Sequence, residues 1–232
     1  MGLRERLMEA MGTLGLHGMK ACYDEIMAAG IKTRATPEKI LCELLETELA
    51  ERKARSIRYR MGLAKFPVDK DLDQFNFTES PVNETQVRHL YDGNFLADHT
   101  NIIMVGGTGS GKSHLAVAIA RQSIRNGGKA RFFNVLDLVN QLEQEKLDSR
   151  GGRLADHLVR HDLVILDELG YLPFSKNGGQ LLFHLISKLY ERTSLIITTN
   201  RLCGAPHNRF NAESSIMWRE GPRGPATTSS FQ

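Results

Sequence analysis

The fold of this chain is constrained most by one glycine-rich segment, Gly106-Gly107-Thr108-Gly109-Ser110-Gly111-Lys112-Ser113. The segment fits the pattern G-x-x-x-x-G-K-[ST], and it lies between an apolar run that predicts a buried strand (101–105) and a stretch that predicts a helix (114–120). Backbone N–H groups can close around phosphate oxygens only where side chains do not block the approach, and glycine also permits positive φ. The pattern therefore predicts a strand, a phosphate-binding loop and a helix, in that order.

The last two residues of this segment add chemistry to the loop. Lys112 is expected to reach the β- and γ-phosphates of a nucleotide, and the hydroxyl of Ser113 is expected to hold Mg²⁺. The following helix contributes the partial positive charge of its N-terminus. A flexible glycine-rich turn is the alternative, but it does not explain why Lys112 and Ser113 follow at once. No Asn-Lys-x-Asp motif occurs, which argues against a guanine-specific GTPase.

Two adjacent carboxylates follow a second apolar run, Leu163-Val164-Ile165-Leu166. In a protein with a phosphate loop, the first acid, Asp167, can hold the Mg²⁺ shell. Its neighbour Glu168 can act as general base on the attacking water. The alternative is a solvated strand end, but acids at the carboxyl end of a parallel strand lie where open α/β sheets bind ligands.

Strands and helices alternate from residue 101 onward, which predicts a parallel sheet with crossover helices. The expected strands are 101–105, 130–134, 163–167 and 194–200. Runs this apolar are typical of sheets that are covered on both faces. We expect Asn200, at the tip of the fourth strand, to point toward the γ-phosphate as a polar sensor, although an Asn in this position is often only a turn residue.

The chain before this core predicts a small all-α N-terminal domain over residues 1–62, with one helix ending at Gly30 and the next beginning at Pro37. Residues 63–100 are expected to form a linker and a short helix that starts near Asn83 and ends near Gly93. The net charge of +3 excludes a uniformly basic nucleic-acid coat, so a local patch is the place to look. Three arginines at the end of the second helix could contact DNA, or could form an ordinary solvated face: Arg52, Arg55 and Arg58.

The cysteines and the N-terminus bear on the compartment. Cys22, Cys42 and Cys203 are far apart, with no C-x-x-C pair and no His at metal-ligand spacing. This usage is typical of reduced thiols, so we expect a cytoplasmic protein. The sequence shows no signal peptide and no membrane span.

Several motifs together resemble one family. They are Gly106–Ser113, Leu166-Asp167-Glu168-Leu169-Gly170, Ile196-Ile197-Thr198-Thr199-Asn200, the N-terminal Leu16-His17-Gly18-Met19, and the stretch from Ala64-Lys65-Phe66-Pro67 to Phe75-Asn76-Phe77. Over roughly residues 1–200 the chain is similar to the IstB-like helper ATPases of bacterial insertion sequences, which are relatives of the helicase loader DnaC. The joint pattern is far more specific than a phosphate loop alone.

The resemblance implies a P-loop NTPase sheet of the AAA+ type, with ATP and Mg²⁺ as cofactors. It implies a homo-oligomer that assembles on double-stranded DNA in its ATP state and assists a transposase in choosing or capturing a target. Carried over to this sequence, Asp167 and Glu168 become the Walker-B pair and Asn200 becomes the first sensor. Two other functions stay open: a helicase loader, and a nucleotide-gated DNA-binding module with little turnover.

Residues 201–232 depart from the family pattern. The segment is rich in Gly, Pro and Ser, and it has little to bury beyond Ile216, Met217 and Trp218. We therefore expect an irregular tail, a sheet that ends with the Asn200 strand, and slow hydrolysis, as a truncated or frame-shifted C-terminus would give. Four arginines in the tail are candidates for a residue that completes a neighbouring subunit's site: Arg201, Arg209, Arg219 and Arg223.

Overall fold

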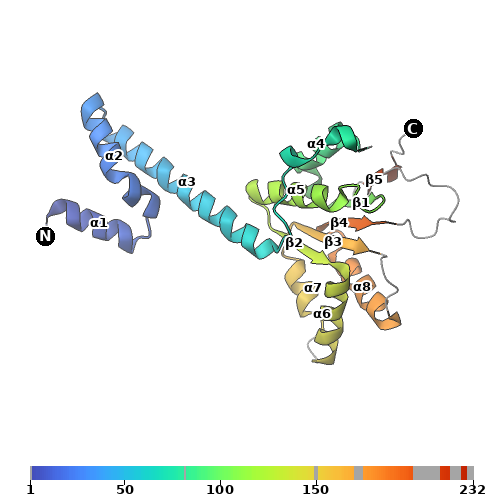
Figure 1. Cartoon of the computed structure of the whole chain (residues 1–232). Coiled ribbons are helices and arrows are strands. Elements are labelled where there is room, and N and C mark those ends of the chain that lie inside the picture. The colour runs from blue at the N-terminus through green and yellow to red at the C-terminus, as the bar shows by residue number, and fades with distance from the viewer. Residues whose placement is uncertain are drawn as a thin grey trace. The chain divides into compact units, whose positions relative to one another are not determined.

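The computed structural model describes residues 2–80, 82–148, 151–169, 175–200, 215–219 and 226–228. The chain divides into two compact units, Met1–Tyr59 and Arg60–Gln232. Figure 1 shows the first as helices only and the second as a sheet with helices on both of its faces. Each unit has its own core.

The N-terminal unit is built from α1 (Leu3–Thr13), α2 (His17–Thr33) and most of α3 (Pro37–Ala64). Its small core consists of Met11, Met19 and Leu44, with Leu16, Tyr23, Ile26 and Ile40 packed against them. The predicted start at Pro37 is confirmed, but the predicted end at Gly30 is wrong, because α2 continues to Thr33. Gly30 is needed for close packing instead: a Cβ there would lie 2.6 Å from Cδ1 of Ile40.

A buried carboxylate joins α2 to α3. Glu48 is 3% exposed, and its carboxylate accepts hydrogen bonds from Nε of Arg52 at 2.7 Å and from the backbone N–H groups of Gly18 at 2.7 Å and Met19 at 3.2 Å. The hydrogen bond from Arg52, together with the two backbone donors, lowers the pKa of Glu48 below its usual value. Gly18 allows the close crossing of the helices, because a Cβ there would lie 2.8 Å from the carbonyl oxygen of Thr47.

Short helical turns connect the helical unit to the sheet. They are the 3₁₀ turns Leu72–Gln74, Phe77–Glu79 and Asn94–Leu96, and the helix α4 (Glu84–Asp92). Asn83 caps α4 by accepting a hydrogen bond from the N–H of Gln86, and Gly93 ends the helix with φ +86°. The predicted short helix is therefore confirmed at both ends.

Four parallel strands form the centre of the second unit: β1 (Asn101–Val105), β2 (Ala130–Asn134), β3 (Leu163–Leu169) and β4 (Ser194–Thr199). Besides α4, this unit contains the helices α5 (Lys112–Arg125), α6 (Val135–Leu147), α7 (Arg153–Leu158) and α8 (Lys176–Leu189). In Figure 1, α4 and α5 lie on one side of the sheet and α6, α7 and α8 on the other. The predicted parallel sheet is confirmed, and its two covered faces explain its apolar strands.

The sheet does not end at β4 as the sequence predicted. Its order is β2-β3-β4-β1-β5-β6, in which β5 (Ser215–Arg219) runs antiparallel to β1 and β6 (Ala226–Thr228) pairs with β5. The prediction was wrong because β1 offers a row of unpaired backbone groups at its outer edge, and pairing with it orders a short run that contains Ile216, Met217 and Trp218. The other residues of 201–232 lie outside the described part of the chain.

The last turn of α3 is tied to the edge strand β2. Arg60 donates hydrogen bonds from Nη1 to the carbonyl oxygens of Gly127 and, at 3.1 Å, of Gly128, in the turn before β2. Arg131, on β2 itself, donates to the carbonyl oxygen of Leu63. This bond satisfies a carbonyl at the end of α3 that has no partner within the helix. Within the described residues, no helix combines the length and the apolar character that a membrane crossing requires.

Candidate active site

The predicted phosphate loop connects β1 to α5 at the carboxyl edge of the sheet. The N–H of Gly106 donates to the carbonyl oxygen of Thr199 at 3.2 Å, so the loop begins beside the end of β4. Gly109 and Gly111 have φ values of +80° and +86°, which glycine adopts without strain. The loop leads directly into α5 at Lys112, so the unpaired N–H groups at the start of this helix lie beside the glycine-rich loop.

The ammonium group of Lys112 lies folded back on its own loop. Its Nζ donates to the carbonyl oxygens of Gly106 and Gly107, each at 2.7 Å, and to Oγ of Ser110 at 3.2 Å. Partial burial lowers the pKa of Lys112, and the nearby charges of Asp167 and Glu168 oppose that shift. The lysine is therefore held at the loop by carbonyl oxygens, which are weaker partners than phosphate oxygens would be.

Asp167 connects β3 and β4 to the phosphate loop. It is 7% exposed, and its Oδ1 accepts a hydrogen bond from Oγ of Ser113 at 2.8 Å. The same oxygen accepts another from Oγ1 of Thr198 on β4 at 2.5 Å. Oγ1 of Thr198 in turn accepts a hydrogen bond from the N–H of Glu168 at 2.9 Å. The serine at the start of α5 and the two predicted acids thus belong to one hydrogen-bonded chain.

The backbone around Glu168 is irregular. Glu168 has φ +66°, which is uncommon for a residue other than glycine, and the register of β3 against β4 shifts between Leu166 and Leu169. A bulge of this kind turns a side chain away from its regular direction in the strand. The carboxylate of Glu168 is exposed, and its Oε2 accepts a hydrogen bond from Nδ2 of Asn134, at the end of β2, at 2.8 Å.

The hydroxyl of Ser113 and the carboxylate of Asp167 suit a magnesium ion. Both supply oxygen atoms, and Mg²⁺ in phosphate-transfer sites is usually bound by one or two protein groups together with substrate phosphates and water. Among the described residues, no group of three or more His, Cys, Asp and Glu side chains is placed to hold a metal ion on its own. The Ser113 and Asp167 pair fits an ion that is shared with nucleotide phosphates.

Comparison with known proteins assigns this chain to a family. Residues 9–216 match the model of the IstB-like ATP-binding proteins. This chain belongs to that family. It is 33% identical over 203 residues to an insertion sequence IS5376 protein of Geobacillus stearothermophilus that is named as ATP-binding, a match that covers 87% of this chain and 81% of the relative. A Sinorhizobium fredii insertion-sequence protein, also named as ATP-binding, is 38% identical over 201 residues, 86% of this chain and 67% of the relative.

A solved structure supports the fold of this IstB-like chain. The AMPPCP-bound DnaA of Aquifex aeolicus has a TM-score of 0.51 and 17% identity, over 59% of this chain and 43% of DnaA. This likeness supports the predicted fold, a parallel sheet with flanking helices and a glycine-rich loop after β1. Membership of the family supports ATP as the nucleotide.

Two other groups of residues were predicted to be functional, Asn200 and the three arginines of the second predicted helix. Asn200 follows β4 directly and is exposed, next to Thr199, where β4 meets the start of the phosphate loop. The three arginines predicted to contact DNA, Arg52, Arg55 and Arg58, lie on α3 in the N-terminal unit, and each is near a carboxylate. Arg52 pairs with Glu48 at 2.7 Å, while Arg55 and Arg58 lie 3.5 and 4.0 Å from Glu51.

Sequence reasoning missed Thr198 and Asn134 as residues of the site. Both are polar residues near the carboxyl ends of strands, and Thr198 also lies in the motif Ile196–Asn200, but neither signal marks a site residue by itself. Their importance follows from the strand order, because β3 lies between β2 and β4 and the bulge in β3 is held from both sides. That order is not readable from the alternation of strands and helices.

Proposed function

We propose that this chain binds ATP and Mg²⁺ at the loop Gly106–Ser113, hydrolyses ATP in a DNA-dependent manner, and assists a transposase in selecting or capturing target DNA. The observation that carries the proposal is the chain of hydrogen bonds from Ser113 through Asp167 and Thr198 to Glu168. It joins a loop suited to phosphate and an acid suited to activating water within one site. The relatives named above are insertion-sequence proteins, which supports the transposition setting.

Each site residue has a distinct part in this proposal. Lys112 exchanges its carbonyl partners for the β- and γ-phosphate oxygens, which are stronger acceptors for an ammonium group. Ser113 and Asp167 hold Mg²⁺, which neutralises charge on the phosphates. Glu168 accepts the proton of the attacking water. Asn200 senses the γ-phosphate from the end of β4.

Two substitutions separate binding from turnover. Lys112→Ala is expected to abolish binding of a fluorescent ATP analogue, because it removes the cation of the loop. Glu168→Gln is expected to bind the analogue normally and to lose turnover, because an amide cannot accept the proton. Near-normal binding by the first variant would refute the assignment of the loop, and failure of the second to bind would make Glu168 structural.

The DNA dependence is tested by measuring ATP turnover with and without double-stranded DNA. Stimulation by DNA supports the proposed helper ATPase, and a further increase when the transposase is added supports the transposition role. Binding of ATP with no turnover under either condition would favour a nucleotide-gated module. Stimulation by a replicative helicase in place of a transposase would favour a helicase loader.

The three arginines of α3 are proposed to contact DNA phosphates. Their side chains are 54%, 46% and 74% exposed, for Arg52, Arg55 and Arg58 in turn, and their partners are on the same helix. The pairs of Arg55 and Arg58 with the half-exposed Glu51 contribute only about 0.2–1 kcal/mol, so a phosphate can replace this partner at small cost, whereas the partner of Arg52 is the buried Glu48. Glu51, half-exposed between them, works against DNA binding, so the proposal needs a direct test.

Replacing the three arginines by alanine should weaken binding to all DNA sequences. The slope of log K against log salt should become shallower by about 0.9 for each phosphate that the protein no longer neutralises. Arg88→Ala is a matched control, because Arg88 on α4 is 62% exposed and is paired with Glu84 four residues earlier. An unchanged slope in the triple variant would place the DNA-binding surface elsewhere.

Hydrolysis by this chain alone is proposed to be slow. Ring ATPases complete each site with an arginine from the next subunit, and its positive charge stabilises the transition state. Of the four candidate arginines in the tail, Arg219 ends β5, and the other three lie outside the described residues. The test is turnover of this chain against turnover after the C-terminal segment of a longer relative is appended. Rapid DNA-stimulated hydrolysis by the 232-residue chain would refute this part.

A further inference from the structure

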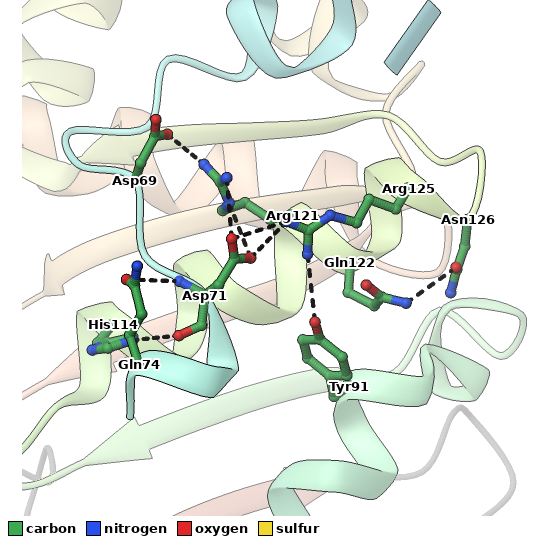
Figure 2. Close-up of polar contacts among 9 residues, drawn as sticks. All are labelled: Asp69, Asp71, Gln74, Tyr91, His114, Arg121, Gln122, Arg125 and Asn126. Atoms are coloured by element: carbon green, nitrogen blue, oxygen red, sulfur yellow. Dashed lines mark hydrogen bonds and ion pairs between the residues drawn. The ribbon is translucent and has the colours of Figure 1, made fainter. Parts of the chain in front are cut away.

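A segment of the linker lies along the helix that follows the phosphate loop. We call residues 69–77 the linker brace. Figure 2 shows its acidic side chains, Asp69 and Asp71, facing two arginines of α5. Arg121 donates to Asp69 and lies 3.3 Å from Asp71, and Arg125 approaches the carboxylate of Asp71 to 2.8 Å. Two arginines one helical turn apart thus hold one carboxylate.

The carboxylate of Asp71 is held in its charged form by the two arginines, and we call it the anchor of the brace. Its burial alone would raise the pKa of Asp71, but the hydrogen bonds from Arg125 and Arg121 outweigh the burial and hold that pKa below its usual value. Arg125 is steadied in turn by the hydroxyl of Tyr91 on α4, at 3.4 Å from Nη1. The anchor therefore stays charged at neutral pH and joins the brace, α4 and α5.

The backbone of the brace reaches the start of α5. The carbonyl oxygen of Asp71 lies 2.8 Å from Nε2 of His114, which directly follows Ser113. The same carbonyl accepts a hydrogen bond from the N–H of Gln74 at 3.1 Å, and the N–H of Phe75 donates to the carbonyl oxygen of Leu72 at 3.0 Å. Because Leu72 is buried, this 3₁₀ turn fixes the position of Phe75.

Phe75 packs on the closing turn of the phosphate loop. A Cβ on Gly111 would lie 2.4 Å from Cε2 of Phe75, so the aromatic ring occupies the space beside that glycine. The ring meets His114 edge to face with centroids 5.3 Å apart, and Phe77 with centroids 4.9 Å apart. Gly111 and His114 flank Lys112 and Ser113. The brace thus contacts the residues on either side of the proposed phosphate and magnesium ligands.

We propose that Asp71 and Phe75 are positioning residues for the nucleotide: the linker brace holds the turn Gly111–His114 in the geometry that binds phosphates. The inference rests on the proposed function of the loop. It assigns the brace to binding and not to the chemical step, because Asp167 and Glu168 are held by Thr198 and Asn134 instead.

The test compares Phe75→Ala and Asp71→Asn with the wild-type chain and with Asp69→Asn as control. Asp69 belongs to the same segment, but its side chain is 87% exposed, so its pair with Arg121 contributes little. Titration with a fluorescent ATP analogue gives both the Kd and the number of sites per chain. We expect Kd and KM to rise about tenfold in the first two variants, with the number of sites and kcat unchanged and the control within about twofold of wild type. Phe75→Leu should recover most of the affinity.

The outcomes separate positioning from simple destabilisation. A variant that is only less stable would show fewer sites with an unchanged Kd, and that result, or an unchanged Kd with all sites present, would overturn the proposal. If Phe75→Ala does not fold, His114→Ala removes the bond to the carbonyl of Asp71 and must raise the Kd in its place. Failure of wild-type protein to bind the analogue would refute the proposed function itself, independently of the brace.

Discussion

The hydroxyl of Thr198 connects Asp167 to Glu168, and removing it tests the described site most directly. It is 1% exposed, donates to the carboxylate of Asp167 and accepts from the N–H of Glu168. Thr198→Val keeps the shape of the side chain and removes both bonds. A hydrogen bond to a charged group contributes about 1.5–3 kcal/mol and a neutral one about 0.5–1.5 kcal/mol. We therefore expect the free energy of unfolding to fall by about 2–4 kcal/mol.

A matched control is available at Thr193, between α8 and β4. Thr193 is fully buried, and among the described residues its hydroxyl has no hydrogen-bond partner. Thr193→Val should therefore leave stability unchanged or raise it, because it removes an unpaired buried polar group. The difference between the two variants isolates the bonds at Thr198 from the general effect of a threonine-to-valine change.

The single tryptophan makes the measurement specific to the sheet. Trp218 lies on β5 in register with Ile102 of β1, so urea unfolding followed by tryptophan fluorescence reports on this unit. For a unit of this size, a loss of about 2–4 kcal/mol corresponds to a Tm lower by about 4–16 °C. If Thr198→Val is no less stable than Thr193→Val, the bulge at Glu168 is held by something other than this hydroxyl.

Three other contacts can be tested in the same way. Because the pKa of Glu48 is lowered on folding, the stability that its carboxylate contributes is present above pH 4.5 and is lost as pH falls through the lowered value. In Glu48→Gln, this acid dependence of stability, followed by circular dichroism, should disappear. Asn134→Ser keeps an oxygen that can cap α6, but the shorter side chain cannot reach Glu168. Because the bond from Asn134 restrains the carboxylate of the proposed base, ATP turnover without DNA should rise in this variant. Unchanged turnover would mean that the contact does not restrain the base. Gly18→Val should lower the free energy of unfolding of the helical unit by about 1–3 kcal/mol, since its side chain meets the backbone of Thr47, and an unchanged urea midpoint would contradict this.

The features predicted correctly depend on local signals. The central strands are apolar runs because both faces of the sheet are covered, and α4 begins at Asn83 and ends at Gly93 because capping is decided within a few residues. The strand, glycine-rich loop and helix around Gly106–Ser113 were predicted for the same reason, since the glycines, lysine and serine are consecutive.

The features that sequence reasoning missed depend on partners far away in the chain. Gly30 suggested a helix end, but in the structure it lies inside α2, where the absence of a side chain lets Ile40 of α3 pack closely. The strand Ser215–Arg219 is too short to be recognised without β1 beside it. Thr198 and Asn134 become site residues only once β2, β3 and β4 are known to be neighbours.

The ties between α3 and β2 bear on how the second unit can be isolated. β2 is an edge strand, and exposed edges of this kind recruit strands from other molecules. Here the end of α3 engages the edge, through Arg60 at the preceding turn and Arg131 on the strand. A shortened chain that begins after Ala64, where α3 ends, would lose both of these hydrogen bonds beside the β2 edge and should aggregate more readily. One that begins ahead of Arg60 keeps both bonds and should aggregate less.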